Sequence, residues 1–145
     1  MHSSCVTGDI LGSLRCDCGS QLQLALSKIK KYGYGVLLYL NQEGRGIGIT
    51  NKIRSYKLQE QGLDTYEANH KLGFADDERD FSIAAAILKS LKISEINLLS
   101  NNPHKLAELK KHGIVIKKRV PIVGKSGKYN KAYITAKVEK AGHIF

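Results

Sequence analysis

Apolar runs alternate with helix-like segments along this 145-residue chain, and that alternation limits its possible folds more than any other feature. Three short apolar runs bounded by turn residues predict buried strands at 35–40, 95–99 and 114–116. Apolar residues at helical spacing predict helices over 21–32 and 81–91, and a helix ended by Gly62 is expected over 47–61. Asn102 as a cap and Pro103 at the first position predict a helix over 103–113. This order predicts the α/β class, as a single domain with a largely parallel sheet flanked by helices.

The composition is that of a globular domain, with 42% hydrophobic and 25% charged residues. The net charge of +10 favours polyanionic partners, either nucleic acid or a phosphorylated small molecule. The basic residues gather at 28–31, 105–119 and 125–131, and each of these groups could instead be a solvated helix face. No nucleic-acid recognition motif accompanies them. No apolar run approaches the roughly 18 residues of a membrane span, and no signal segment opens the chain. We therefore expect a cytoplasmic protein.

All three cysteines, Cys5, Cys16 and Cys18, lie close to the start of the chain. An odd number cannot pair completely into disulfides, and free thiols agree with a reducing compartment. Three thiolates are a common ligand set for zinc, and a catalytic zinc keeps a fourth position open for water. The alternative is three ordinary buried thiols.

Polar motifs follow two of the predicted strands, at the strand ends where open α/β sheets collect ligands. In the segment 41–48, glycines would let backbone amides approach a phosphate, and Arg45 could add a bidentate contact. The segment 100–105 joins a helix start to a hydroxyl and a lysine. Either segment could instead be an ordinary turn, because the glycine spacing is not that of the dinucleotide fingerprint.

A third polar segment, 73–80, places four carboxylates and an arginine before an apolar helix. It could be a helix-capping cluster matched to the helix dipole. It could also provide a carboxylate base beside a cation, able to move a proton or stabilise a phosphoryl transition state. Tyr56 and Thr65 add hydroxyls that could bind a ligand or simply pack and cap, and His70 could be a surface residue or a ligand.

Together these segments resemble GTP cyclohydrolase II of riboflavin biosynthesis, in register from His2 to Ile144. The most specific matches are 2–5, 7–9, 14–19, 42–48, 51–54, 67–69, 74–80 and 101–103. That family hydrolyses GTP, releasing formate from the imidazole ring and pyrophosphate from the triphosphate, and leaves a diaminopyrimidine ribosyl phosphate. The resemblance implies the same activity for this chain, with GTP as substrate and a homodimer as the assembly. It implies neither a membrane nor a specific nucleic-acid partner.

Carried over by position, the resemblance implies Mg²⁺ on the triphosphate and one zinc ion (Zn²⁺) per chain, held by Cys5, Cys16 and Cys18. It implies substrate contacts for His2, Ser3, Ser4, Gln21, Glu43, Gly44, Arg45, Thr65, Ser100 and Lys105. It implies three catalytic roles: a proton acceptor, a nucleophile toward the α-phosphate, and a helper in ring opening, at Asp77, Arg79 and Tyr56 respectively. Because a guanidinium stays protonated far above neutral pH, we favour a charge-stabilising role for Arg79.

The chain departs from the family pattern at three places. It begins immediately before His2, where family members carry further residues, including an arginine two positions before that histidine. Ser4 stands where glutamate is usual, and Ser100 stands where threonine is usual. We therefore expect an N-terminally shortened catalytic domain over 1–145 with a weaker grip on phosphates. The alternative is a catalytically weakened or inactive zinc-containing paralogue that binds a nucleotide or RNA.

Overall fold

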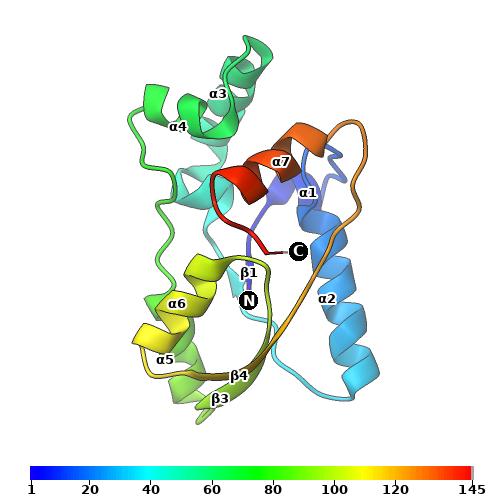
Figure 1. Ribbon diagram of the computed structural model, residues 1–145, viewed down its shortest axis with the longest axis vertical. Helices are drawn as coiled ribbons and strands as arrows, with labels where there is room; N and C mark the ends of the chain where they lie inside the picture. The colour runs from blue at the N-terminus through cyan, green and yellow to red at the C-terminus, as the bar shows by residue number, and fades with distance from the viewer. Residues whose placement is uncertain (145) are drawn as a thin grey trace.

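The protein is described by a computed structural model over residues 1–144 (Figure 1), so the last position of the predicted domain 1–145 lies outside the described residues. The α/β class is confirmed. The strands are β1 (His2–Ser3), β2 (Tyr39–Leu40), β3 (Glu95–Leu99) and β4 (Val115–Val120). A 3-10 turn, η1, covers Glu43–Gly46. The helices are α1 (Val6–Asp9), α2 (Cys18–Tyr32), α3 (Gly48–Glu60), α4 (Thr65–Lys71), α5 (Ser82–Ser90), α6 (Pro103–Lys111) and α7 (Lys131–Glu139).

Pairing between strands is parallel, as predicted, but within residues 1–144 it forms two separate pairs instead of one continuous sheet. β1 pairs with β2, and β3 pairs with β4 around the connecting helix α6. The predicted strand at 35–40 is therefore shorter than expected, because only Tyr39–Leu40 has a neighbouring strand. Residues 35–38 instead line a large cavity.

The four predicted helices form within a few residues of their expected bounds, and local signals explain where they end. Gly33 stops α2 in the left-handed conformation, with φ of 99°, and its N–H donates to the carbonyls of Ile29 and Lys30. Asn102 caps α6 by accepting from the N–H of His104 at 2.8 Å. Three helices were not predicted: the four-residue α1, α4 and α7.

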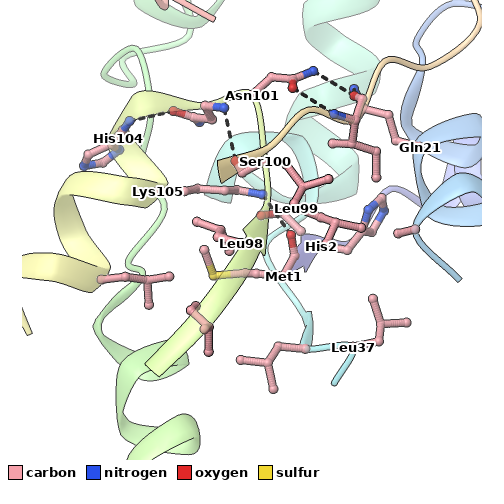
Figure 2. A pocket seen from close by; sticks show the side chains of 18 of the residues that line it. Met1, His2, Gln21, Leu37, Leu98, Leu99, Ser100, Asn101, His104 and Lys105 are labelled. Carbon is pink, nitrogen blue, oxygen red and sulfur yellow. Dashed lines mark hydrogen bonds between the residues drawn. The ribbon is translucent and has the colours of Figure 1, made fainter. Parts of the chain in front are cut away.

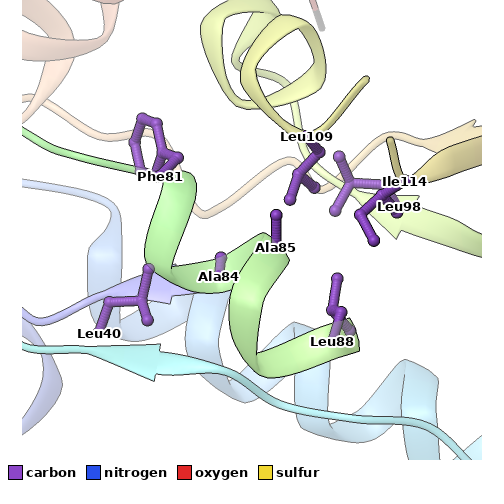
Figure 3. Packing of buried hydrophobic residues seen from close by; sticks show 8 residues of the cluster. All are labelled: Leu40, Phe81, Ala84, Ala85, Leu88, Leu98, Leu109 and Ile114. Atoms are coloured by element: carbon purple, nitrogen blue, oxygen red, sulfur yellow. The ribbon is translucent and has the colours of Figure 1, made fainter. Parts of the chain in front are cut away.

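The hydrophobic core surrounds α5, whose apolar face packs between β2 on one side and β3 and α6 on the other (Figure 3). Its buried members are Leu40, Phe81, Ala84, Ala85, Leu88, Leu98, Leu109 and Ile114. Burying a leucine, isoleucine or phenylalanine side chain contributes about 1.5–3 kcal/mol, so this cluster fixes both strand pairs against one helix.

The carboxyl ends of the strands lead directly into the polar motifs. β1 runs into Cys5, β2 runs into η1, and β3 runs into the segment 100–102. The ion pair between Lys137 and Asp17 places α7 against the turn that starts α2, and Figure 1 draws α7 and α1 in the same part of the molecule. Over residues 1–144, no helix has the length and apolar character needed to cross a membrane.

Candidate metal and nucleotide site

The three cysteines converge on one point although they come from two loops. Cys5 follows β1, whereas Cys16 and Cys18 form the turn that starts α2. Their three Sγ atoms lie within 4.8 Å of one another, and the Sγ atoms of Cys5 and Cys16 are 3.7 Å apart. Tetrahedral zinc with Zn–S bonds of about 2.3 Å needs sulfurs about 3.8 Å apart, so the donor set fits this metal.

Two glycines allow the cysteine loops to approach each other. A Cβ on Gly8 would lie 2.9 Å from Sγ of Cys16 and 3.2 Å from Sγ of Cys5. A Cβ on Gly19 would lie 2.2 Å from the carbonyl oxygen of Gly8. Larger residues at these two positions would therefore separate the sulfurs, which explains why glycines flank the cluster.

The three cysteine thiols differ in pKa. Hydrogen bonds from Cys16 and Cys18, followed by one from Lys52, hold the pKa of the Cys5 thiol well below its ordinary value. The pKa of Cys18 is raised well above its ordinary value by its hydrogen bonds to Cys16 and Cys5 and by burial. Of the three thiols, that of Cys5 therefore loses its proton most readily.

A buried ion pair, not foreseen from the sequence, borders the cluster. Nζ of Lys52 donates to Oε1 of Glu43 at 2.6 Å, to Sγ of Cys5 at 3.0 Å and to Oγ1 of Thr7 at 2.9 Å. Oε2 of Glu43 accepts from the N–H of Val6 at 2.6 Å. The Glu43 carboxylate therefore holds the cysteine loop through both oxygens. The one sequence signal for Lys52 was its place in the matched segment 51–54.

Two adjoining cavities contain the predicted site residues. The larger, of about 1010 Å³, lies between β1, α2, β3 and the C-terminal segment. The smaller, of about 90 Å³, surrounds the cysteines. Both are lined by Ser3, Cys18, Arg45, Arg79 and Tyr133, so these residues form their common wall.

Every residue to which the family resemblance assigns a role lines one of the two cavities. The larger cavity is lined by His2, Ser3, Cys18, Gln21, Arg45, Asp77, Arg79, Ser100 and Lys105. The smaller is lined by Ser3, Ser4, Cys5, Cys16, Cys18, Glu43, Gly44, Arg45, Tyr56, Thr65 and Arg79. Figure 2 shows Ser100, Lys105 and His2 around the same part of the larger cavity. The structure brings these residues together, and their roles toward a substrate stay predictions.

The acidic segment 73–80 divides into one interior carboxylate and several exterior ones. Asp77 makes a two-pronged contact with Arg79, at 2.7 Å from Nε to Oδ1 and 2.5 Å from Nη2 to Oδ2. Although burial raises the pKa of Asp77, the hydrogen bonds and charge of Arg79 hold it below its ordinary value. Asp80 instead bonds Ser82 at the start of α5, which is the capping role that the sequence left open.

Arg45 occupies a backbone conformation that non-glycine residues rarely adopt, with φ of 62°. Its guanidinium stacks on the ring of Tyr66 at 4.4 Å, and its buried Nη1 has no hydrogen-bond partner among the described residues. A Cβ on the adjacent Gly46 would lie 2.9 Å from the backbone of Glu78, whose N–H donates to the carbonyl of Arg45 at 2.9 Å. A half-buried cation on a strained backbone, with a spare buried donor, is suited to binding an anion.

Lys105 adds a second basic side chain, whose charged form is disfavoured by its surroundings. Burial, followed by the charges of Arg79 and Lys137, lowers the pKa of Lys105 to about 7. Its Nζ donates to the carbonyl of Met1 at 3.4 Å (Figure 2). Together with Arg45 it gives the cavity the positive charge that a phosphate chain would neutralise.

His70, left open as a surface residue or a ligand, lies on the surface. Its Nε2 is 2.7 Å from Oδ1 of Asp76, and both side chains are exposed. The sequence did not indicate Asp17 or Lys137, which form a second buried ion pair at 2.5 Å behind the cysteine turn. The signal that could have found Asp17 is its place between Cys16 and Cys18.

Comparison with known proteins agrees with this geometry. The profile of the family described as GTP cyclohydrolase II matches residues 1–121. The chain is 55% identical over 144 residues to the riboflavin biosynthesis protein RibBA of Bacillus cytotoxicus, and 54% identical to that of Bacillus mycoides. Each match covers 99% of this chain and 36% of the relative, so the chain spans about a third of the length of these relatives. The chain therefore belongs to the GTP cyclohydrolase II family.

Proposed function

We propose that the protein hydrolyses GTP in a zinc-dependent reaction, releasing formate and pyrophosphate and leaving a diaminopyrimidine ribosyl phosphate for riboflavin biosynthesis in the cytoplasm. One observation carries the proposal: the thiolate cluster and the cation-lined cavity share a wall that includes Cys18, Arg45 and Arg79. The two ends of a nucleoside triphosphate, a base to be opened and a polyanion to be bound, would meet these two parts of the site.

At the base end, Cys5, Cys16 and Cys18 would hold the zinc ion. When bound, that ion would supply an acidified water able to attack the ring carbon between the two imidazole nitrogens. Tyr56 lines the same small cavity and would place its hydroxyl beside the opening ring. Thr65 would add a second hydroxyl from the start of α4.

At the phosphate end, Arg45, Arg79 and Lys105 would stabilise the charge of the triphosphate. Asp77 holds the Arg79 guanidinium by two hydrogen bonds, which leaves Nη1 of Arg79 directed to Ser3 at 3.4 Å. This arrangement supports charge stabilisation by Arg79, because its tie to a carboxylate favours the protonated guanidinium. Any transfer of a proton to Asp77 would first have to break that contact.

Mg²⁺ would enter the site bound to the triphosphate. The carboxylate near the phosphate end, that of Asp77, is already paired with Arg79. Mg²⁺ is usually held by substrate phosphates, waters and one or two carboxylates. Here the phosphates, rather than protein carboxylates, would supply most of its ligands. A homodimer remains a prediction, to be checked by light scattering on the purified chain.

The test is to incubate zinc-loaded protein with GTP and Mg²⁺ and to measure formate and pyrophosphate together. We expect both products from the wild type. Cys16→Ser should abolish formate release while leaving the far-ultraviolet circular dichroism spectrum unchanged. Leu14→Ala, a change in the same loop at an exposed side chain, is the matched control and should keep both products.

Formate release by a zinc-free preparation, or by Cys16→Ser, would refute the metal role. Binding of GTP without any formate from the zinc-loaded wild type would instead identify the chain as a nucleotide-binding paralogue. The paired measurement therefore separates the enzyme from its binding-only alternative.

A further inference from the structure

The C-terminal segment 131–144 returns to the metal turn, although the family profile matches only residues 1–121. Asp17 stands between Cys16 and Cys18, and only 1% of its surface is exposed. Its Oδ1 accepts a hydrogen bond from Nζ of Lys137 on α7 at 2.5 Å. Only 9% of the Lys137 side chain is exposed, so this ion pair lies in the interior, behind the cysteine turn.

Further contacts join the same turn to the residues just before the segment 131–144. Nδ2 of Asn130 donates to the carbonyl of Cys16 at 3.4 Å. Oδ2 of Asp17 accepts from Nε2 of Gln21 at 2.7 Å, so both carboxylate oxygens are bonded. A Cβ on Gly124 would lie 3.0 Å from the backbone oxygen of Asp17, which shows how closely the preceding segment packs on the turn.

The same segment also forms part of the large cavity. Tyr133, Lys137 and His143 all line it. Burial, followed by the charges of Lys137 and Arg79, lowers the pKa of His143 to about 4. Lys137 likewise contributes to the lowered pKa of Lys105. Its ammonium is therefore close enough to the cationic wall to influence it, while Asp17 balances its charge.

We propose that Lys137 is a positioning residue for the metal site, which makes the segment 131–144 a structural part of that site. Asp17 lies between the two cysteines of the turn, so fixing its carboxylate at both oxygens restricts how the turn can rotate. By holding Asp17, Lys137 directs Cys16 and Cys18 toward Cys5 before any metal arrives. The inference rests on the metal assignment in the proposed function, and it does not depend on GTP turnover.

The test is zinc affinity, measured by competition with a chromophoric chelator, together with the absorption spectrum of the Co²⁺-substituted protein. Lys137→Met keeps the length of the side chain and removes its charge. Loss of a group that orients metal ligands typically weakens metal binding about 10–100-fold, and we expect a loss in this range with an altered Co²⁺ spectrum. Lys137→Arg should recover part of the affinity.

Lys131→Met is the matched control, because Lys131 is exposed at the start of the same helix and lines neither cavity. It should bind zinc like the wild type. A purely structural role for Lys137 would lower the unfolding temperature but leave the zinc affinity and the Co²⁺ spectrum unchanged. That result in folded Lys137→Met would overturn the proposal.

Removing Lys137 alone leaves the Asp17 carboxylate buried without its cation, and the single variant could fail to fold. The double variant Asp17→Asn with Lys137→Met removes both charges and avoids this penalty. We expect it to fold and still to bind zinc more weakly than the wild type, whereas wild-type affinity would overturn the proposal. Absence of GTP turnover in the wild type would count against the proposed function alone, because zinc affinity is measured without GTP.

Discussion

Nζ of Lys52 lies 3.0 Å from Sγ of Cys5, which places a buried ammonium directly against one sulfur of the three-cysteine cluster. The same nitrogen is 2.6 Å from Oε1 of Glu43, so a sulfur, a cation and a carboxylate stand in succession. Burial lowers the pKa of Lys52, but its hydrogen bonds to Glu43 and Cys5 outweigh burial and raise it above its ordinary value. The cation is therefore a permanent part of the cluster's electrostatics.

This relationship predicts a large effect on stability. Lys52→Met should lower the free energy of unfolding by about 3–5 kcal/mol, because it leaves the buried Glu43 carboxylate without its cation. Lys57→Met, at an exposed position of the same helix, should change it by less than about 0.5 kcal/mol. Urea unfolding of the metal-free variants measures both. A loss below about 1 kcal/mol for Lys52→Met would contradict the ion-pair interpretation.

Arg79→Ala should depress formate and pyrophosphate release together. The substitution removes a charge-assisted contact worth about 1.5–3 kcal/mol, which corresponds to roughly 10- to 100-fold weaker binding of a nonhydrolysable GTP analogue. Calorimetric titration and the paired product assay check the two expectations. Arg54→Ala, at an exposed arginine outside both cavities, should behave like the wild type. Normal pyrophosphate release by Arg79→Ala would show that Arg79 does not act on the phosphates.

Two substitutions of Arg45 separate the effect of its backbone strain on stability from the effect of its guanidinium on ligand binding. Arg45→Gly and Arg45→Ala both remove the guanidinium and its stacking on Tyr66, but only alanine keeps a Cβ at a φ of 62°. We expect the glycine variant to be more stable than the alanine variant by about 1 kcal/mol, since the left-handed conformation costs about 1–2 kcal/mol for residues with a Cβ. Both should bind the GTP analogue more weakly than the wild type. Equal stabilities would show that the loop relaxes.

Polyphosphate binding should depend on pH through Lys105, whose pKa is lowered to about 7. In the ligand-free protein this amine is charged below that pH and neutral above it, whereas a bound polyanion favours the charged form. Affinity for inorganic tripolyphosphate should therefore fall as pH rises above about 7, by at most about tenfold per pH unit. Titrations from about pH 6.5 to 8.5 measure this slope.

Two variants isolate the contribution of Lys105 from the titration of the ligand itself. Lys105→Met should lose the pH-dependent part of the affinity and keep only what the ligand contributes. Lys110→Met, at an exposed position of the same helix, should keep the wild-type slope. An identical slope in Lys105→Met and the wild type would assign the pH dependence elsewhere.

Periodicity predicted α2 and α5, whose apolar residues recur at helical spacing, and the Asn102 cap with Pro103 predicted α6. It overestimated the strand at 35–40, since an apolar run does not reveal whether it pairs with a strand or lines a cavity. It missed α7, whose buried face includes a lysine, so its apolar pattern is weak.

The candidate site was predictable where residue type alone suggests chemistry, as for the three cysteines. The buried pairs Glu43–Lys52 and Asp17–Lys137 were not predictable, because their partners are far apart in sequence and lysines are usually solvated. In the acidic segment 73–80, residue type alone could not tell Asp77 from Asp80, and only the family resemblance singled out Asp77. Only the fold turns one carboxylate toward a cavity residue and the other toward a helix end.

The close approach of Gly46 to the backbone of Glu78 has a consequence for the kind of ligand this site accepts. It joins the loop that carries Arg45 to the loop that carries Arg79 by main chain alone, with no adjustable side chain between them. This contact fixes the backbone of the two arginines. Each guanidinium is held further, that of Arg45 by stacking on Tyr66 and that of Arg79 by its hydrogen bonds to Asp77, so that their spacing is preset. Selectivity among anions would then come from their length, and engineering for a shorter or longer phosphate chain must begin at Gly46.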